Sequence, residues 1–328
     1  MTEAARDEER DVIAKMRTIG CLLVIGAHCS AIPSNASSLI GIIQPVAGSV
    51  CMVGVWFFFL LSGYLFYGNK RSFGDFWRRK LITIIIPWCF TGALVYSYVV
   101  IRKGGFSIAG MAAFILGIGS YLWYMLALTA LFLIAWILRP TRHVGACLLV
   151  IGLSLIVICP PRFWENDAWW YPVNGGWALC FAVGYAVREH DLLTVLIRYA
   201  EKFFIPILAF VFVALILIGK FGRVVYYWSD AYVPFCVVMT AAFFGLCRRV
   251  PSVPLFEKAA GRSFAIYLLH MPAAGGIANI LNRFDRGWTL LLRPFLVMVI
   301  TISIIEIVLY FARKCKISGF VAMLIGMR

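Results

Sequence analysis

Charged residues are scarce in this sequence, and their scarcity excludes the class of soluble proteins. Only 14% of the 328 residues are charged, whereas 62% are apolar or aromatic. A soluble domain carries about 25% charged residues, so this chain could not cover its surface in water. Among the charged residues the acidic ones are fewer, with 15 Asp and Glu against 30 Lys and Arg. No polar stretch is long enough to fold as a separate soluble domain.

Several motifs of pumps, redox proteins and secreted proteins are missing. The sequence has no G-x-x-x-x-G-K-[ST], which excludes an ATP-driven pump acting by itself. Its ten cysteines form no C-x-x-C pair and lie almost entirely in apolar runs, so we expect buried thiols and no bound metal. The segment Met1–Asp11 is polar and of mixed charge, unlike a cleavable signal peptide, so the first apolar run is expected to stay as a helix.

Long apolar runs are what the sequence has in abundance. A run of about 18 or more apolar residues spans the roughly 30 Å hydrocarbon core as a helix, and these runs lack the alternation of a barrel strand. The sequence therefore predicts an all-α polytopic membrane protein, a single domain over 1–328 with about ten transmembrane helices. The predicted spans are 16–32, 49–67, 81–101, 120–138, 144–159, 173–187, 203–219, 233–247, 263–282 and 289–312.

Three of the apolar segments are unusual in length. The fifth and sixth spans are short for a full crossing, which favours tilted helices. The segment 107–119 is apolar but too short to span, and suits an interfacial or re-entrant piece.

The basic residues punctuate the apolar runs, which predicts the orientation of the chain. With the N-terminus inside, the inner segments hold 22 of the 30 Lys and Arg residues. This is the positive-inside pattern, so 1–15 and 313–328 are expected to be cytoplasmic. Because the basic residues do not follow one soluble face, we expect membrane lipids as partners and no nucleic acid. The outer loop 160–176 is rich in Trp and Tyr, which fits an interfacial belt or a sugar-binding mouth.

Ionisable residues inside a membrane are costly, so each is a functional candidate. His28 follows Arg17 by about three helical turns, which places it about 16 Å farther along the helix and on nearly the same stripe. If Arg17 lies at the inner headgroups, His28 is buried near the midplane. It is then either a hydrogen-bonding contact between helices or a general base that takes a proton from a hydroxyl.

Other candidates lie in the second, ninth and tenth spans. Ser62, beside Gly63, fits close helix packing or a polar contact to a substrate. Tyr267 lies one turn before His270, and Glu306 needs a partner within the last span. An alternative function, a proton-coupled transporter or flippase, would use His28, His270 and Glu306 as a relay.

A basic cluster precedes the third span. The segment from Asn69 to Lys80 is dense in Lys and Arg, more so than topology requires. Arginine forks match phosphate oxygens, so Arg78, Arg79 and Lys80 are candidates for holding a phosphorylated cofactor; the alternative is a positive-inside anchor. Trp123 and Tyr124, which start the fourth span, fit an interfacial belt or a substrate contact.

The order of these motifs is more specific than any one of them. It resembles the acyltransferase-3 family of membrane acyltransferases along essentially the whole chain. The motifs are Arg17-x10-His28, Phe57-Phe58-Phe59-Leu-Leu-Ser62-Gly63-Tyr64, the basic cluster before Pro87, Leu122-Trp123-Tyr124 and Ser263-Phe-Ala-Ile-Tyr267-Leu-Leu-His270.

The resemblance implies an O-acyltransferase of a bacterial cytoplasmic membrane. Such an enzyme takes an acyl group, usually acetyl, from cytoplasmic acyl-CoA and passes it to a hydroxyl of a glycan or lipid-linked sugar. By this likeness His28 is the catalytic histidine, Arg17 positions the acyl-CoA, and Arg78 and Arg79 hold its phosphates. Tyr267, His270 or Ser62 are candidates for the oxyanion contact.

The sequence also departs from the family pattern. Tyr121 stands where many relatives have a histidine, Ile82-Thr83 where they often have another basic residue, and Val55-Trp56 where an acidic residue is frequent. No extracytoplasmic hydrolase-like domain is expected, so the acyl group would pass directly to its acceptor or to a separate protein.

Overall fold

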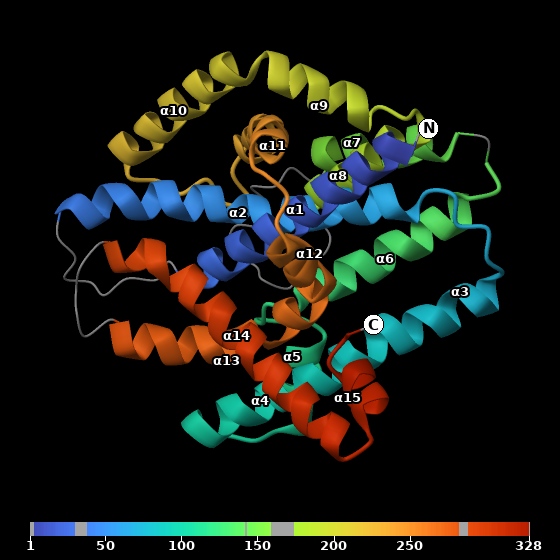
Figure 1. Cartoon of the computed structure of the whole chain (residues 1–328), viewed down its shortest axis with the longest axis vertical. Coiled ribbons are helices and arrows are strands. Elements are labelled where there is room, and N and C mark those ends of the chain that lie inside the picture. The colour runs from blue at the N-terminus through green and yellow to red at the C-terminus, as the bar shows by residue number, and fades with distance from the viewer. Residues whose placement is uncertain (1–2, 30–37, 142, 159–173, 282–287, 328) are drawn as a thin grey trace.

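A computed structural model describes residues 3–29, 38–141, 143–158, 174–281 and 288–327, and in these ranges the chain is helical, with no strand. Figure 1 shows most helices running side by side along one direction. The helices are α1 (Glu3–Cys29), α2 (Ser38–Phe66), α3 (Phe73–Lys80), a π-helical turn (Leu81–Ile85), α4 (Ile86–Lys103), α5 (Ile108–Ile115), α6 (Trp123–Leu138), α7 (Val144–Ile158), α8 (Gly175–Glu189), α9 (Leu193–Lys202), α10 (Phe204–Phe221), α11 (Tyr232–Arg249), α12 (Pro254–Gly261), α13 (Ser263–Leu281), α14 (Trp288–Lys314) and α15 (Ser318–Leu324).

A helix corresponds to each of the ten predicted spans, and among the described residues seven helices are long and apolar enough to cross a membrane. Those seven are Arg6–Cys29, Gly41–Phe66, Phe73–Arg102, Phe204–Phe221, Tyr232–Arg249, Ser263–Leu281 and Leu291–Lys314. The other three are α6, α7 and α8, with 16, 15 and 15 residues. The fifth and sixth spans are therefore short, as predicted. The chain is a multi-pass helical membrane protein.

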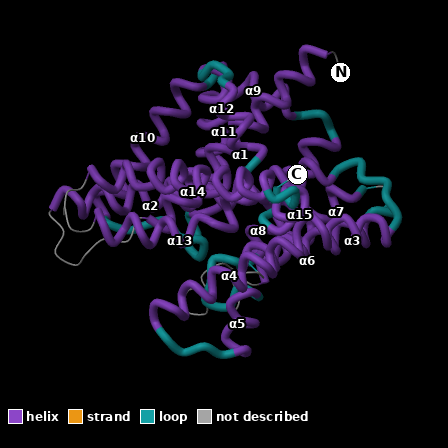
Figure 2. Tube along the Cα trace, turned by 60° about the horizontal axis from the view of Figure 1, so that its bottom comes forward, coloured by secondary structure: helices purple, strands orange, loops and turns teal. Residues whose placement is uncertain are grey.

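Two segments differ in extent from the prediction. The polar start of the chain is not separate from the first span, because α1 is one helix from Glu3 onward. The third span is longer at its start, since the basic α3 continues through the π turn into α4. The segment 107–119 contains only the short helix α5, which Figure 2 shows projecting with α4 from the rest of the bundle. The aromatic loop 160–176 falls almost wholly outside the described residues.

The helix α2 packs tightly against α8 because both helices have glycine at their point of closest approach. A Cβ added at Gly63 would overlap the backbone carbonyl of Phe181, and one added at Gly184 would overlap that of Leu60. Small residues allow membrane helices to approach to backbone contact. The predicted role of Gly63, admitting another helix beside Ser62, is thus what the structure shows.

The helix α1 ends beside the middle of α2. A Cβ on Gly26 would meet the Cys51 sulfur, and Cys51 lies close to the midpoint of α2 between Ser38 and Phe66. The two helices are antiparallel, since Gly20 of α1 lies against Phe58. The last turn of α1, which carries His28, is therefore level with the centre of a long membrane-crossing helix.

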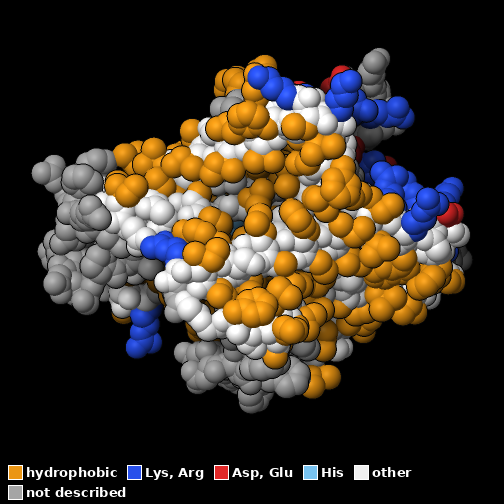
Figure 3. Space-filling view, turned by 90° about the horizontal axis from the view of Figure 1, so that it is seen from below, with side chains coloured by type: hydrophobic (Ala, Val, Ile, Leu, Met, Phe, Trp, Pro, Cys, Tyr) orange, Lys and Arg blue, Asp and Glu red, His pale blue; other side chains and the backbone are white. Residues whose placement is uncertain are grey.

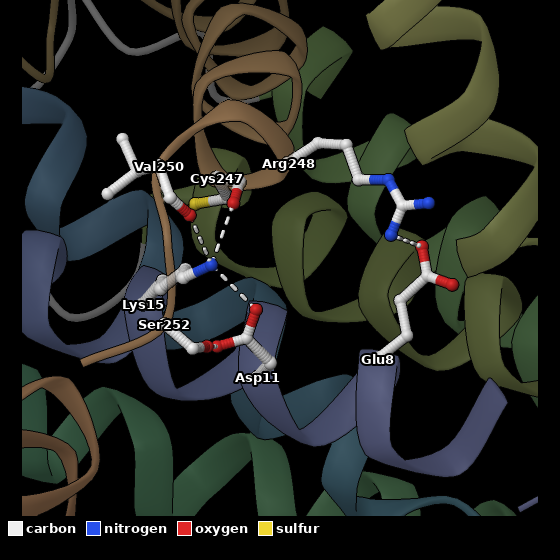
Figure 4. Close-up of polar contacts among 7 residues, drawn as sticks. All are labelled: Glu8, Asp11, Lys15, Cys247, Arg248, Val250 and Ser252. Atoms are coloured by element: carbon white, nitrogen blue, oxygen red, sulfur yellow. Dashed lines mark hydrogen bonds and ion pairs between the residues drawn. The ribbon is translucent and has the colours of Figure 1, made fainter. Parts of the chain in front are cut away.

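Ion pairs fasten the N-terminal half of α1 at one end of the bundle. Glu9 pairs with Arg188 at 2.7 Å, and Glu8 pairs with Arg248 at 2.8 Å. Lys15 is buried and donates to Asp11 at 2.6 Å and to the last carbonyls of α11 at Cys247 (3.0 Å) and Val250 (2.7 Å). Figure 4 shows this arrangement, with Ser252 completing it through a bond to Asp11.

The same end carries most of the positive charge visible on one face of the protein. Figure 3 shows a surface dominated by hydrophobic side chains, with Lys and Arg gathered mainly at the right, where Figure 1 places the N-terminus, and smaller groups at the left. That this end faces the cytoplasm stays a prediction of the positive-inside rule.

Candidate active site

A cavity of about 500 Å³ penetrates the bundle between α1, α2, α3, α6 and α13. Its mouth lies at the loop after α2, and its wall reaches inward along α6 and α13. The lining includes several residues selected from the sequence, namely Arg17, Ser62, Arg79, Lys80, Tyr124 and Tyr267. The cavity therefore brings together segments from the first helix and from the last third of the chain, which lie far apart in the sequence.

The charge on the described cavity wall is entirely positive. Arg17, Arg71, Arg79 and Lys80 line it, and no Asp or Glu is among its described lining residues. Arg71 and Arg79 are exposed, whereas Lys80 is half-buried with its ammonium 3.6 Å from the centre of the Phe132 ring. Because four cations meet around one cavity, the cavity suits a ligand with several negative charges.

The local sequence explains how these cations are placed. The Ser72 hydroxyl caps the start of α3 by accepting from the backbone N–H of Asp75, so the basic residues fall in the last turn of a short helix. The π turn follows at once, and Pro87 lies just beyond it. Proline lacks an N–H and its ring crowds the carbonyl four residues earlier, here that of Thr83, which lines the cavity. The widened turn is therefore part of the cavity wall, and such turns are frequent at functional sites.

Three tyrosines form a row of neighbouring rings from the inner end of the cavity to a pair of histidines. The rings of Tyr124 and Tyr267 lie 5.3 Å apart, and those of Tyr267 and Tyr121 lie 5.8 Å apart. Tyr267 donates its hydroxyl to the Tyr121 carbonyl at 2.6 Å, and Tyr121 donates its own to the Leu268 carbonyl at 2.6 Å. These reciprocal bonds fix α13 against the start of α6.

His28 and His270 are neighbours at the end of this row of tyrosines. Their ring centres lie 5.2 Å apart, and the Tyr121 ring lies 6.1 Å from His28 and 5.4 Å from His270. The sequence placed both residues inside the membrane, but it did not predict that they meet. The two histidines come from α1 and α13, which pack against each other.

The two imidazoles differ in exposure and in hydrogen bonding. His270 is fully buried, and its Nδ1 lies 2.7 Å from the Tyr267 carbonyl and 3.2 Å from that of Ile266. Since a carbonyl only accepts, Nδ1 is the protonated nitrogen of the neutral ring. Its Nε2 is then an acceptor, and it has no hydrogen-bond partner among the described residues.

His28, in contrast, is exposed. The prediction of a buried histidine is therefore wrong for His28 in one respect: it lies level with the centre of α2, yet its surface remains reachable. Among the described residues, His28 lies in the last turn of α1, which ends at Cys29. A reachable imidazole is what general-base chemistry on a substrate requires.

Three of the residues selected from the sequence lie elsewhere. Arg78 is exposed but is not among the residues that line the cavity. Trp123 is buried against Trp177, with ring centres 5.2 Å apart, and away from the cavity. Glu306 forms an ion pair with Arg262, which precedes His270 by about two helical turns and hence by about 12 Å.

Arg71 lines the cavity but is not among the residues predicted from the sequence to hold a cofactor. It belongs to the same basic cluster as Arg79, and the sequence does not show which members of that cluster face the cavity. The described residues contain no cluster of His, Cys, Asp and Glu suited to a metal ion.

Fold and site together define a multi-pass helical membrane protein with a cationic cavity that leads toward paired histidines. The sequence matches the family model described as an acyltransferase domain, of the acyltransferase-3 type, over residues 15–310. This match covers most of the chain, and the protein belongs to that family of membrane acyltransferases. Comparison with curated proteins and with solved structures gave no match.

Proposed function

We propose that this protein moves an acyl group, in the simplest case acetyl, from cytoplasmic acyl-CoA to a hydroxyl of a cell-surface glycan or lipid-linked sugar. The observation that carries the proposal is the cationic cavity, which extends from Arg71 and Arg79 at its mouth to Tyr124 and Tyr267 beside the histidine pair. A donor entering this cavity would bring its reactive end toward His28.

The mouth of the cavity suits the phosphate-bearing part of CoA. CoA carries a diphosphate and a further phosphate, and Arg71, Arg79, Lys80 and Arg17 provide positive charge around one opening. The opening lies at the end of the bundle where basic residues gather, which the positive-inside rule assigns to the cytoplasm. The same rule puts both termini in the cytoplasm, so in this proposal the mouth faces the compartment that supplies acyl-CoA.

The chemistry then requires the proton of the acceptor hydroxyl to be transferred twice. His28 accepts the proton of the acceptor hydroxyl while the hydroxyl oxygen attacks the thioester carbonyl. The carbon–sulfur bond breaks, a carbon–oxygen ester bond forms, and the proton passes from His28 to the leaving CoA sulfur. The acceptor approaches the exposed side of His28, from the opposite end to the donor.

We assign His270 as a positioning residue for His28. Its Nδ1 is fixed by two carbonyls, so its Nε2 presents a lone pair beside the His28 ring. This nitrogen has no hydrogen-bond partner among the described residues, so the His28 ring would have to turn an N–H toward it during catalysis. The other nitrogen of His28 would then be the base, which is how catalytic histidines are usually oriented.

The oxyanion that forms during attack needs hydrogen-bond donors. The hydroxyls of Tyr267 and Tyr121 already donate to backbone carbonyls, which removes Tyr267 from this role. Ser62 and Tyr124, which interact with each other on the cavity wall, are the better candidates.

The test is acyl transfer from radiolabelled acetyl-CoA by the purified protein, with membrane glycans of its host as acceptors. His28→Ala should abolish transfer while expression and thermal stability stay unchanged. His143→Ala is the matched control, since His143 is exposed at the start of α7. Full transfer by His28→Ala, or transfer that does not depend on a CoA thioester, would contradict the proposal.

The alternative function, a proton-coupled transporter, gains no support from the site. Its relay required His28, His270 and Glu306 to lie together, and only the two histidines do so. Glu306 is paired with Arg262, which lies about two helical turns from His270.

A further inference from the structure

A second cavity of about 350 Å³ lies between α1, α2 and α8 on one side and α9, α10 and α11 on the other. In Figure 1, α9 and α10 run along the upper edge of the protein with α11 beneath them. The described cavity wall is almost entirely apolar, and it contains no charged residue. It therefore cannot hold the phosphates or the sugar that the proposed reaction requires, and it needs a different ligand.

The shape of this cavity fits a single hydrocarbon chain. Along α11 its lining runs from Val233 to Phe244, a distance of about 16 Å at the helical rise. This length and the volume of about 350 Å³ are of the size that a hydrocarbon chain fills.

The slot opens sideways to the lipid. Its rim consists of apolar side chains with large exposed fractions, namely Leu196 (38%), Tyr199 (57%), Phe203 (46%) and Val237 (55%). Val237 belongs to a membrane-crossing helix, and α10, which begins one residue after Phe203, is the least buried of the crossing helices. Hydrocarbon is therefore the medium at the opening, and each methylene that enters gains packing with the wall rather than leaving water.

One end of the slot lies at a basic interfacial helix. The helix α9 buries Leu193, Ile197 and Ala200. It exposes Arg198, Glu201 and Lys202, and the Glu201 carboxylate is paired with Arg248 at 3.6 Å. An amphipathic helix with basic residues on its polar face lies in the membrane interface and attracts anionic lipid. Arg198 forms no ion pair with any other described residue, which leaves it available to a headgroup.

We propose that the slot binds an acyl chain of an anionic phospholipid, whose headgroup lies at Arg198 and Lys202. Its floor connects this lipid to the candidate active site. Leu61 lines both cavities, and Met16 on the floor of the slot is adjacent in sequence to Arg17 of the cationic cavity. A bound chain would support the wall that holds Arg17. This consequence rests on the proposed function, but binding of the lipid does not.

The test uses the full chain in phosphatidylcholine vesicles that contain phosphatidylglycerol with a photoreactive diazirine in its acyl chain. After illumination, peptide mass spectrometry locates the adducts. Label is expected on the slot residues of α2, α8, α9 and α11. Leu196→Trp and Val237→Trp, which fill the rim, should reduce this labelling about tenfold.

Two variants serve as matched controls. Val195 (43% exposed) and Leu246 (39%) lie on the same helices as Leu196 and Val237 but do not line the slot. Val195→Trp and Leu246→Trp should leave the labelling unchanged, and all four proteins should melt at similar temperatures. R198Q/K202Q should remove the preference for phosphatidylglycerol over a phosphatidylcholine with the same diazirine.

Three results would overturn the proposal. One is equal loss of label in Leu196→Trp and Val195→Trp, and another is label confined to the outer face of α10. The third is displacement of the label by a long-chain acyl-CoA, which would assign the slot to the acyl donor. Because labelling requires no catalysis, an inactive protein that still labels would separate failure of the proposed function from failure of this inference.

Discussion

The Tyr121 hydroxyl donates to the Leu268 carbonyl at 2.6 Å, and Pro272 is the reason that this carbonyl is available. In an α-helix the carbonyl of residue 268 would accept from the N–H of residue 272, but proline has none. Tyr121 thus replaces the missing helical donor in α13. Tyr121 therefore has a structural role, since its side chain holds α13 in place beside the histidines.

Removing this hydroxyl should destabilise the protein in a way that a second substitution repairs. Tyr121→Phe leaves the Leu268 carbonyl without a partner, which costs about 1–3 kcal/mol and lowers the melting temperature. Pro272→Ala restores an N–H, so the double variant Y121F/P272A should melt above Y121F alone. Thermal unfolding in detergent measures the melting temperatures of the single and double variants. If the two substitutions lower the melting temperature additively, Pro272 is not the reason that this carbonyl needs Tyr121.

The Lys15 ammonium should be important for stability despite lying near the end of the chain. It is buried, and its three bonds join α1 to the end of α11. Lys15→Met removes the positive partner of Asp11 and leaves two carbonyls unpaired, a loss of about 3–5 kcal/mol. Arg10→Met is the control, since Arg10 is exposed and pairs only with Asp7 at 3.7 Å among the described residues. Hydrogen exchange should show faster opening of residues 3–16 in Lys15→Met alone.

The positions of Arg71, Arg78 and Arg79 give a sharp test of donor binding. Arg71→Ala and Arg79→Ala should each raise the KM for acyl-CoA about 10-fold or more, because a charged hydrogen bond contributes about 1.5–3 kcal/mol. Their kcat should change little, since these side chains lie at the mouth of the cavity. Arg78→Ala, which removes the same charge from outside the lining, should have the smaller effect. A larger increase in KM for Arg78→Ala than for Arg79→Ala would contradict the assignment of Arg79 to the mouth of the cavity.

The two histidines should act as a unit. His28→Ala should lower kcat by about 10²–10⁴-fold, as expected for loss of a general base. His270→Ala should also lower kcat, with the KM for acyl-CoA unchanged. The double variant should be no slower than His28→Ala, because a positioning residue has nothing left to orient. Multiplied losses in the double variant would instead give His270 a separate role.

Gly63 offers a test of helix packing that is independent of activity. Gly63→Ala puts a methyl group against the Phe181 carbonyl, where neither backbone is free to move, so the melting temperature should fall. Gly275, within α13, has open space around it. Gly275→Ala should leave stability unchanged or raise it by about 0.5–1 kcal/mol, through better helix propensity.

The sequence was sufficient to predict the helices but not the arrangement of their faces. Apolar run length located the ten helical segments, because span length is set by the bilayer. It also predicted that the fifth and sixth would be short, and that Gly63 would admit a neighbouring helix. These are properties of one helix at a time, or of small residues wherever they occur.

The remainder of the site depends on tertiary packing. Consecutive residues of a helix point about 100° apart, so the sequence alone could not decide that Arg79 rather than Arg78 lines the cavity. His28 and His270 lie near opposite ends of the sequence, and only the packing of α1 on α13 brings them together. The contacts among the three tyrosines could not be predicted either, because they also depend on how α13 packs against the start of α6.

That row of tyrosines also bears on how the membrane stays sealed. An enzyme that admits a donor from one side and an acceptor from the other needs two openings that never join into a continuous water path. Tyr124, Tyr267 and Tyr121 form a row of rings that runs from the cavity to the histidines, and two of their hydroxyls are bound to backbone carbonyls. In the proposed reaction the thioester reaches His28 past this row, and the proton of His28 returns to the CoA sulfur by the same route. The row is therefore the place where leakage of ions between the two proposed openings would have to be prevented.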